Sequence, residues 1–89
     1  MKFVYLVEYR QLNKRTNMFE LYRTEIYSSK AKANRNVDQS MEINKAYDID
    51  EDKTSYLGEN IRRVDYSTIA NSDNVEMRLR MVINKVEVR

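Results

Sequence analysis

Hydrophobic residues follow a strand-like pattern at the beginning of the chain. Residues 2–12 are rich in aromatic and β-branched side chains and poor in helix formers, which is typical of a β-strand. Alternate residues of a strand point to opposite faces. The odd-numbered positions are Phe3, Tyr5, Val7 and Tyr9. The other face begins with Val4 and Leu6, and because both faces are apolar there, we expect a central strand that a helix covers on one side.

The end of the chain alternates more regularly still. Its odd-numbered apolar positions are Val75, Met77, Leu79, Met81 and Ile83. Val86 and Val88 then continue the pattern at even positions, and we expect a β-bulge near Asn84 to bring both sets to one side. Residues 18–27 are predicted to form another strand, which a polar loop over 13–17 joins to the first strand as a hairpin.

A helix is predicted after this hairpin. Ser28 and Ser29 offer a hydroxyl that can accept hydrogen bonds from the free amides of a first helical turn. Good helix formers follow, and the helix is expected from about Lys30 to Tyr47. Its inner stripe is narrow, which suits a helix that lies close against a sheet. The stripe consists of Ala33, Val37, Met41, and Asn44 or Lys45.

The region between the helix and the last strand gives a weaker pattern. Residues 48–53 are predicted to form an acidic loop and residues 71–74 a turn. For residues 56–69 both a short strand and an irregular helical turn fit, and the strand is favoured. The expected architecture is α+β, a small antiparallel sheet of about four strands with one helix packed on it, in the order ββαββ. One domain is expected over residues 1–89.

Composition excludes several chemistries. The 89 residues include no cysteine, no histidine, no proline and a single glycine. Disulfides, thiolate nucleophiles and thiolate-bound zinc are impossible, and the commonest general base and metal ligand is missing. One glycine cannot build a glycine-rich phosphate loop. We therefore expect a protein that is not an enzyme, needs no cofactor and works in the cytoplasm of a host cell, since no secretory or membrane-spanning segment is recognisable.

One acidic stretch partly matches a metal-binding pattern. The EF-hand spacing is met by Asp48, Asp50, Asp52, Thr54, Tyr56 and Glu59. Lys53 stands where the loop needs a glycine in the left-handed conformation, which costs roughly 1–2 kcal/mol and places a positive charge beside the ion. A calcium-binding loop is therefore a minor alternative, and no metal ligand is assigned.

Charge is divided unevenly along the chain. Residues 1–36 carry eight basic and three acidic residues, whereas residues 37–60 carry two basic and seven acidic residues. Tyrosines interleave with the basic residues of the first segment, a pattern that suits base stacking and phosphate contacts. The candidate nucleic-acid-binding residues are Arg10, Lys14, Arg15, Arg23, Lys30, Lys32 and Arg35. A second basic set consists of Arg62, Arg63, Arg78 and Arg80.

The acidic segment supplies a different candidate site. A protein-partner face is predicted at Asp48, Asp50, Glu51 and Asp52. Such a face would suit the basic substrate groove of a nuclease by charge complementarity.

The strand-to-helix junction resembles that of small accessory proteins of T-even-type phages, which serve host takeover and anti-defence. In those proteins an aromatic residue is followed by Ser-Ser-Lys-x-x-Ala, as in residues 27–33 here. The Asn-, Lys- and Tyr-rich composition without Pro or Cys is also similar. The resemblance implies a class of function: such proteins often block host enzymes, restriction or CRISPR effectors, or toxin endoribonucleases. No binding residue is carried over from it.

Two functions remain open from the sequence. The first is a phage-type, antitoxin-like binding protein that inhibits a host or defence protein such as a toxin endoribonuclease, with RNA contact in addition. The alternative is a regulatory module that binds RNA or single-stranded nucleic acid. No membrane partner is expected. A homodimer through residues 75–88 is favoured over a monomer in which this strand is central, because the strand is long and has no proline to protect its edge.

Overall fold

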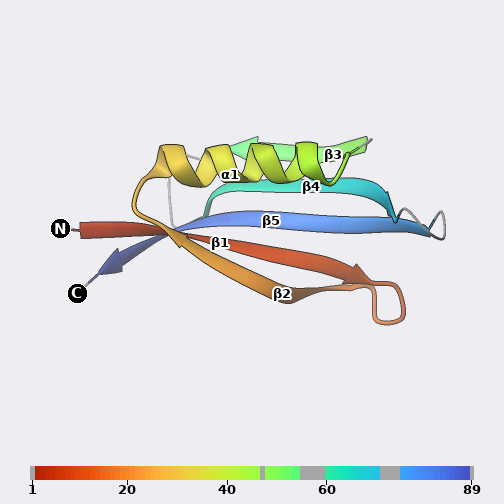
Figure 1. The fold of residues 1–89 in the computed structure, drawn as a ribbon. Coiled ribbons are helices and arrows are strands. Elements are labelled where there is room, and N and C mark those ends of the chain that lie inside the picture. The colour runs from red at the N-terminus through yellow and green to blue at the C-terminus, as the bar shows by residue number, and fades with distance from the viewer. Residues whose placement is uncertain (1, 47, 55–59, 71–74, 89) are drawn as a thin grey trace.

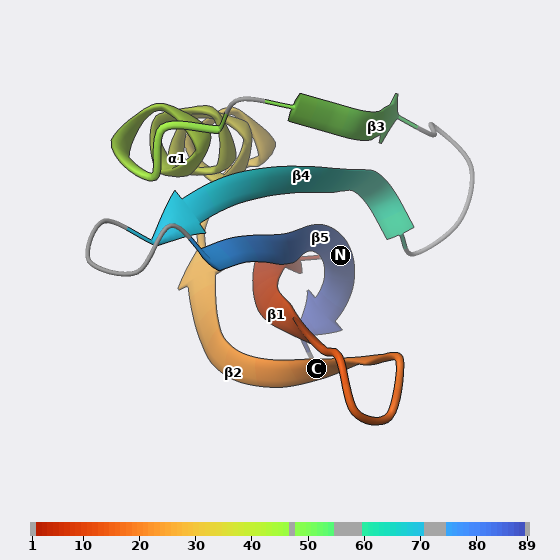
Figure 2. The same cartoon turned by 90° about the vertical axis from the view of Figure 1, so that its right-hand side faces the viewer.

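The structure is a computed structural model that describes residues 2–46, 48–54, 60–70 and 75–88. Its elements follow the order ββαβββ. They are β1 (Lys2–Asn13), β2 (Met18–Tyr27), α1 (Lys30–Ile43), β3 (Asp48–Thr54), β4 (Asn60–Ala70) and β5 (Val75–Val88). The strands form one antiparallel sheet in the order β2-β1-β5-β4-β3, and α1 lies along one side of it (Figure 1). Figure 2 shows how strongly the strands coil.

The α+β class is confirmed, but the expected count of four strands is wrong. Residues 48–54, predicted as a loop up to residue 53, form the strand β3 and pair with β4 from Asp48 opposite Ser67 to Thr54 opposite Arg62. Every side chain of β3 is exposed, so no apolar alternation marks the strand in the sequence. Aspartate is also disfavoured in strands, and the pairing with β4 overrides that preference.

The core lies between α1 and the sheet. Ser29 caps the helix as predicted, because its hydroxyl accepts a hydrogen bond from the amide of Lys32. Ala33 and Val37 of the predicted stripe are fully buried, and Met41 packs at the margin of the core. The buried hydrophobic residues are Val7, Tyr9, Ala33, Val37, Ile61, Val64, Tyr66, Leu79, Met81 and Ile83. The predicted central position of the first strand is also confirmed, since β1 lies between β2 and β5.

The helix ends at Ile43, earlier than the sequence predicts. Lys45 adopts a left-handed conformation with a φ of 54°, and the amide of Ala46 then donates to the carbonyl of Met41 at 2.9 Å. This backbone pattern is a common helix terminator, but the left-handed position is usually a glycine or an asparagine. A lysine there gives no signal in the sequence, so the sequence pattern extends the helix beyond its true end.

The strand favoured within residues 56–69 is confirmed from Asn60 onward as β4, and residues 56–59 lie outside the described part. The predicted bulge near Asn84 is in β4 instead of β5, because the register shifts between Asn60, opposite Asn84, and Arg62, opposite Ile83. Since β5 itself continues regularly along β1, Val86 and Val88 stay on the face opposite to Ile83 and are exposed. The sequence of one strand cannot tell which of two paired strands carries the extra residue.

The terminal strand β5 lies in the middle of the sheet, hydrogen-bonded to β1 on one side and β4 on the other. The predicted homodimer through this strand is therefore wrong, because β5 has no open edge. The two edges of the sheet are β2 and β3. Within the described residues, no helix has the length and apolarity that a membrane span requires.

Candidate functional site

The helix covers one face of the sheet, and three arginines of adjacent strands meet on the other, which we call the open face. Arg80 of β5 stands between its two register partners, Arg10 of β1 and Asp65 of β4. In the neighbouring row, Val82 stands between Glu8 and Arg63. Strand alternation thus places three basic and two acidic side chains on one face.

Asp65 is the centre of this cluster. Its Oδ1 accepts from Nε of Arg80 at 2.7 Å, and its Oδ2 accepts from an Nη of Arg63 at 3.0 Å. The residue is only 8% exposed although no helix covers it. Burial alone would raise the pKa of Asp65, but hydrogen bonds from Arg80 and Arg63 outweigh burial and hold this pKa below its ordinary value. The carboxylate is therefore charged and orients two guanidinium groups.

Phe19 of β2 lies next to these arginines. The guanidinium carbon of Arg80 stands 3.9 Å from the centre of the Phe19 ring, a cation–π geometry. Arg10 donates from Nη1 to the Phe19 carbonyl at 3.4 Å and from Nη2 to Glu8 at 3.3 Å. The cluster thus combines an aromatic ring with guanidinium groups that are held in place.

These side chains border a groove of about 670 Å³ on the open face. The groove is lined by Glu8, Arg10, Asn17, Met18, Phe19, Asn60, Arg63, Arg80, Val82 and Asn84. Three arginines face a single glutamate in this lining, and three asparagines add amide donors and acceptors. Because Asp65 and Glu51 also pair with Arg63 and Arg80, the groove is distinguished by fixed guanidinium and amide groups that can hydrogen-bond a ligand.

The structure disperses the predicted nucleic-acid-binding residues. Only Arg10 lines the groove. Lys14 and Arg15 are exposed in the turn between β1 and β2. Arg23 lies on the helix side of β2, where it pairs with Glu25 and stands 4.9 Å from the ring of Tyr9. The remaining three, Lys30, Lys32 and Arg35, belong to α1.

The tyrosines that accompanied these residues in the sequence are also directed away from the groove. Tyr9 is 4% exposed and donates from its hydroxyl to Asn36 of α1. Tyr27 packs against the core and donates to Glu25. Tyr22 lies beside Tyr9, with 6.4 Å between the ring centres. Of these rings Tyr9 joins the helix to the sheet and Tyr27 packs at the margin of the core, so the three do not form a stacking surface at the groove.

The acidic residues of the predicted protein-partner face lie on β3, and they divide between its two sides. Asp52 pairs with Arg62 on the helix side at 2.9 Å. Glu51 pairs with Arg63 at 3.5 Å, and Asp50 reaches Arg78 at 4.0 Å. Asp48 is exposed at the start of the strand. All four lie on one sheet edge, but ion pairs within the chain already compensate three of them.

Arg62 forms a clamp between β3, β4 and α1. Its three guanidinium nitrogens donate to Asp52, to Asn34 at 3.0 Å and to Asp38 at 2.8 Å. The hydrogen bonds to Asp52 and Asp38 raise the pKa of Arg62 further, against the effect of burial. This arginine, part of the second basic set, therefore has a structural task, and it faces away from the groove.

Two other members of that set, Arg63 and Arg80, are the groove residues that the candidate assignment lacked, together with Phe19. Alternation on the last strand does predict that Arg78 and Arg80 lie on one face of the sheet. It cannot show that Arg10 stands beside Arg80, because register between distant strands is decided by the whole sheet.

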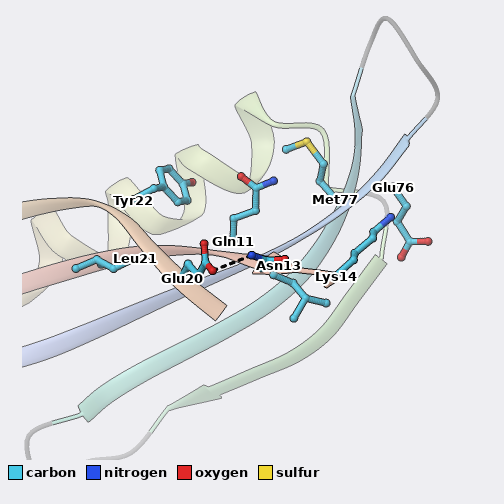
Figure 3. Close-up of a pocket in the computed structure, with 9 residues that line it drawn as sticks. Gln11, Asn13, Lys14, Glu20, Leu21, Tyr22, Glu76 and Met77 are labelled. Carbon is cyan, nitrogen blue, oxygen red and sulfur yellow. Dashed lines mark hydrogen bonds between the residues drawn. The ribbon is translucent and has the colours of Figure 1, made fainter. Parts of the chain in front are cut away.

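A second hollow, of about 470 Å³, lies at the hairpin end of the sheet (Figure 3). Lys14, Glu20 and Glu76 bring charges of both signs to it, and its apolar residues are Leu12, Leu21, Tyr22 and Met77. Asn13 donates to Glu20 at 2.8 Å across its wall (Figure 3). Because its charges are of both signs, it has no distinct ligand preference.

The calcium alternative is not supported. Extended β3 directs Asp52 to the helix side and Asp50 to the open face, so the two carboxylates diverge. Within the described part of the chain, no three acidic residues gather as a metal site would need. Tyr56 and Glu59 lie outside that part.

Comparison with family models, curated proteins and solved structures finds no match to this chain. The chemistry of the groove is therefore the guide to function.

Proposed function

We propose that this protein is a non-enzymatic binding protein that holds a single-stranded nucleic acid in the groove of the open face. One observation carries the proposal: arginines from three adjacent strands line one groove together with Phe19, on the face that α1 leaves uncovered. Nucleic acids bind to sheets through stacking of exposed bases and through cationic contacts to phosphates.

Donor placement and preorganisation support this ligand. The lining carries three guanidinium groups, whose charges Glu8, Asp65 and Glu51 balance. The arginines therefore offer directed N–H donors to phosphate, not an excess of positive charge. Asp65 and Glu8 hold the guanidinium groups in place, so little side-chain entropy is lost when a ligand arrives. Arg63 keeps 45% of its side chain exposed and is the arginine best placed for a first phosphate contact. Single strands are favoured over duplexes because only unpaired bases can stack on side chains.

The test is fluorescence anisotropy with labelled mixed-sequence RNA and DNA oligonucleotides over a range of salt concentrations. Each phosphate contact contributes about −0.7 to the slope of log affinity against log salt for a single strand. Arg63→Gln should lower affinity and flatten the slope by about 0.7. Phe19→Leu should weaken binding by about fivefold or more at all salt concentrations, because base stacking is worth about 1–3 kcal/mol per base.

The matched control is Arg35→Gln, on the exposed surface of α1. It removes the same charge as Arg63→Gln and should leave binding almost unchanged. Equal losses for both variants would show that only net charge matters and would overturn the groove as the site. Absence of binding at low salt would overturn the function itself.

Inhibition of a nuclease is the second candidate, and the exposed acidic edge β3 favours it. The resemblance to phage accessory proteins makes toxin endoribonucleases and host defence nucleases the partners to test first. Purified nucleases would be titrated with the wild type and with Asp48→Asn. Inhibition that falls for Asp48→Asn but persists for Arg63→Gln supports a protein partner at β3, and inhibition that depends on Arg63 and on added RNA supports RNA as the bridge.

A further inference from the structure

The two edges of the sheet differ in how they are protected against pairing. On β3, five of the seven residues are charged: Asp48, Asp50, Glu51, Asp52 and Lys53. Charged side chains are the common protection of an edge strand. The ten residues of β2 include three charged residues but neither lysine nor proline, and four of its large apolar or aromatic side chains are well exposed. Their exposed fractions are 65% for Met18, 49% for Leu21, 55% for Tyr22 and 68% for Ile26.

The surface of the whole molecule is also large for its mass. It measures 6419 Å², whereas a folded monomer of 10.7 kDa is expected to expose about 5,500 Å². The excess of about 900 Å² is close to the ~800 Å² that each partner contributes to an ordinary protein interface. The shape is elongated, with extents of 47 × 27 × 20 Å. The excess area is sufficient for one interface of ordinary size.

We propose that a second copy of this chain pairs antiparallel with the outer edge of β2, across a two-fold axis at Thr24. A two-fold axis perpendicular to a sheet keeps every side chain on its own face, so one residue of β2 must stand opposite itself. An axis at Arg23 or Glu25 would oppose like charges. An axis at Thr24 instead places Arg23 of each copy opposite Glu25 of the other.

The bulge of β2 fits the same arrangement. In the pairing with β1, Tyr9 stands opposite Arg23 and Arg10 opposite Leu21, so Tyr22 is the extra residue. If the second copy skips Tyr22 as β1 does, Leu21 stands opposite Ile26 of the other chain. Both are exposed apolar side chains of the open face, and the pairing would cover them.

This inference is independent of the proposed nucleic-acid ligand, because it uses the edge of the sheet and no residue whose loss tests the groove. The two are compatible, since an axis perpendicular to the sheet leaves both open faces on the same side. A dimer would then present two grooves to one strand of nucleic acid.

The first experiment uses the absence of cysteine from the chain. Residues opposite each other in antiparallel strands have Cα atoms roughly 4.5–5.5 Å apart. That spacing lies within the ~4.4–6.8 Å of disulfides. Thr24→Cys should therefore form a crosslinked dimer in dilute solution under mild oxidation. Thr16→Cys, in the exposed turn before β2, is the matched control and should remain a monomer.

The second experiment tests the register by charge. Arg23→Glu and Glu25→Arg each oppose like charges across the axis, so each variant alone should have the 10.7 kDa mass of one chain by light scattering. In an equal mixture the charges are complementary at all four positions, and the mass should double. Circular dichroism of each variant establishes that it is folded before mixing.

Three results would overturn the proposal. The first is a wild type that keeps the mass of one chain in the high-micromolar range. The second is crosslinking of Thr16→Cys as complete as that of Thr24→Cys. The third is a mixture of folded charge variants that remains monomeric while the wild type dimerises. Loss of RNA binding in Arg63→Gln with an unchanged dimer mass would separate the groove from this interface.

Discussion

On the helix side of the sheet, Val7 of β1, Val64 of β4 and Ile83 of β5 are fully buried beneath α1. Glu8 and Asp65 follow Val7 and Val64 directly in the chain and lie on the opposite face of the sheet. The helix side excludes water by covering apolar groups with a second layer. The open face has no such layer, and a carboxylate there is shielded by the stems of arginines in neighbouring strands, which keep their charged ends toward solvent.

The comparison shows that burial on this sheet does not require a covering element. Asp65 is 8% exposed on the open face, and Leu79 is 4% exposed in the core. Substitution of either residue should lower the free energy of unfolding, but for different reasons. Loss of Asp65 removes charge-assisted hydrogen bonds, whereas loss of Leu79 removes apolar contacts. The two faces should therefore respond differently to substitution and to pH.

The largest effect is expected from Ile83→Ala on the helix side. Removal of a fully buried isoleucine side chain leaves a cavity and should lower the free energy of unfolding by about 3 kcal/mol in urea titrations. Val82→Ala changes the next residue, on the open face, and should cost less than about 1 kcal/mol. If Val82→Ala were as costly as Ile83→Ala, the open face would have to be covered in solution.

The next effect is expected from Asp65→Asn on the open face. The change removes the charge that Arg63 and Arg80 share and should lower the free energy of unfolding by about 2 kcal/mol. Asp50→Asn is the control, because its pair with Arg78 spans 4.0 Å between exposed side chains, and it should cost less than about 0.5 kcal/mol. Equal costs would contradict the shielding of Asp65.

The same pair of variants gives a pH prediction. The pKa of Asp65 is lowered in the folded state, so its contribution to stability is fully present above the ordinary aspartate value of about 3.9. That contribution is lost as the pH falls through the lower pKa that Asp65 has in the folded protein. The difference in unfolding free energy between wild type and Asp65→Asn should therefore shrink below about pH 4. A constant difference through that range would show that Asp65 is not the group responsible.

A smaller effect is expected from Arg62→Met, which removes the clamp between α1 and the sheet edge. Its partners Asp38 and Asp52 are partly exposed and can be solvated, so the loss should be about 1 kcal/mol. Arg78→Met, whose ion pairs are exposed, should cost less than about 0.5 kcal/mol. Amide exchange of α1 should accelerate in Arg62→Met alone, and equal exchange in both variants would exclude the clamp.

The smallest effect is expected from Tyr66→Phe. The buried hydroxyl accepts a hydrogen bond from Asn44 at 2.9 Å, and burial raises the pKa of Tyr66. Because Asn44 is exposed and can turn to water, we expect a loss of about 0.5–1 kcal/mol in thermal or urea unfolding. Tyr22→Phe, at a half-exposed ring, should be neutral, and a loss equal to that of Tyr66→Phe would contradict the difference in burial.

Local sequence determined most of the elements. The strands over 18–27 and 75–88 and the cap at Ser29 follow from alternation and from serine chemistry, which act over a few residues. The inner stripe of the helix was equally readable, because Ala33 and Val37 recur at helical spacing. These signals do not depend on where distant parts of the chain lie.

Only the tertiary structure decided β3, the place of the bulge and the groove. The strand β3 forms because it pairs with the edge of β4. Its exposed, mainly acidic sequence is by itself typical of a loop. The groove requires Arg10, Arg63 and Arg80 to come into adjacent rows across strands far apart in sequence. Sheet register depends on all strands together, so no single segment of the sequence could determine it.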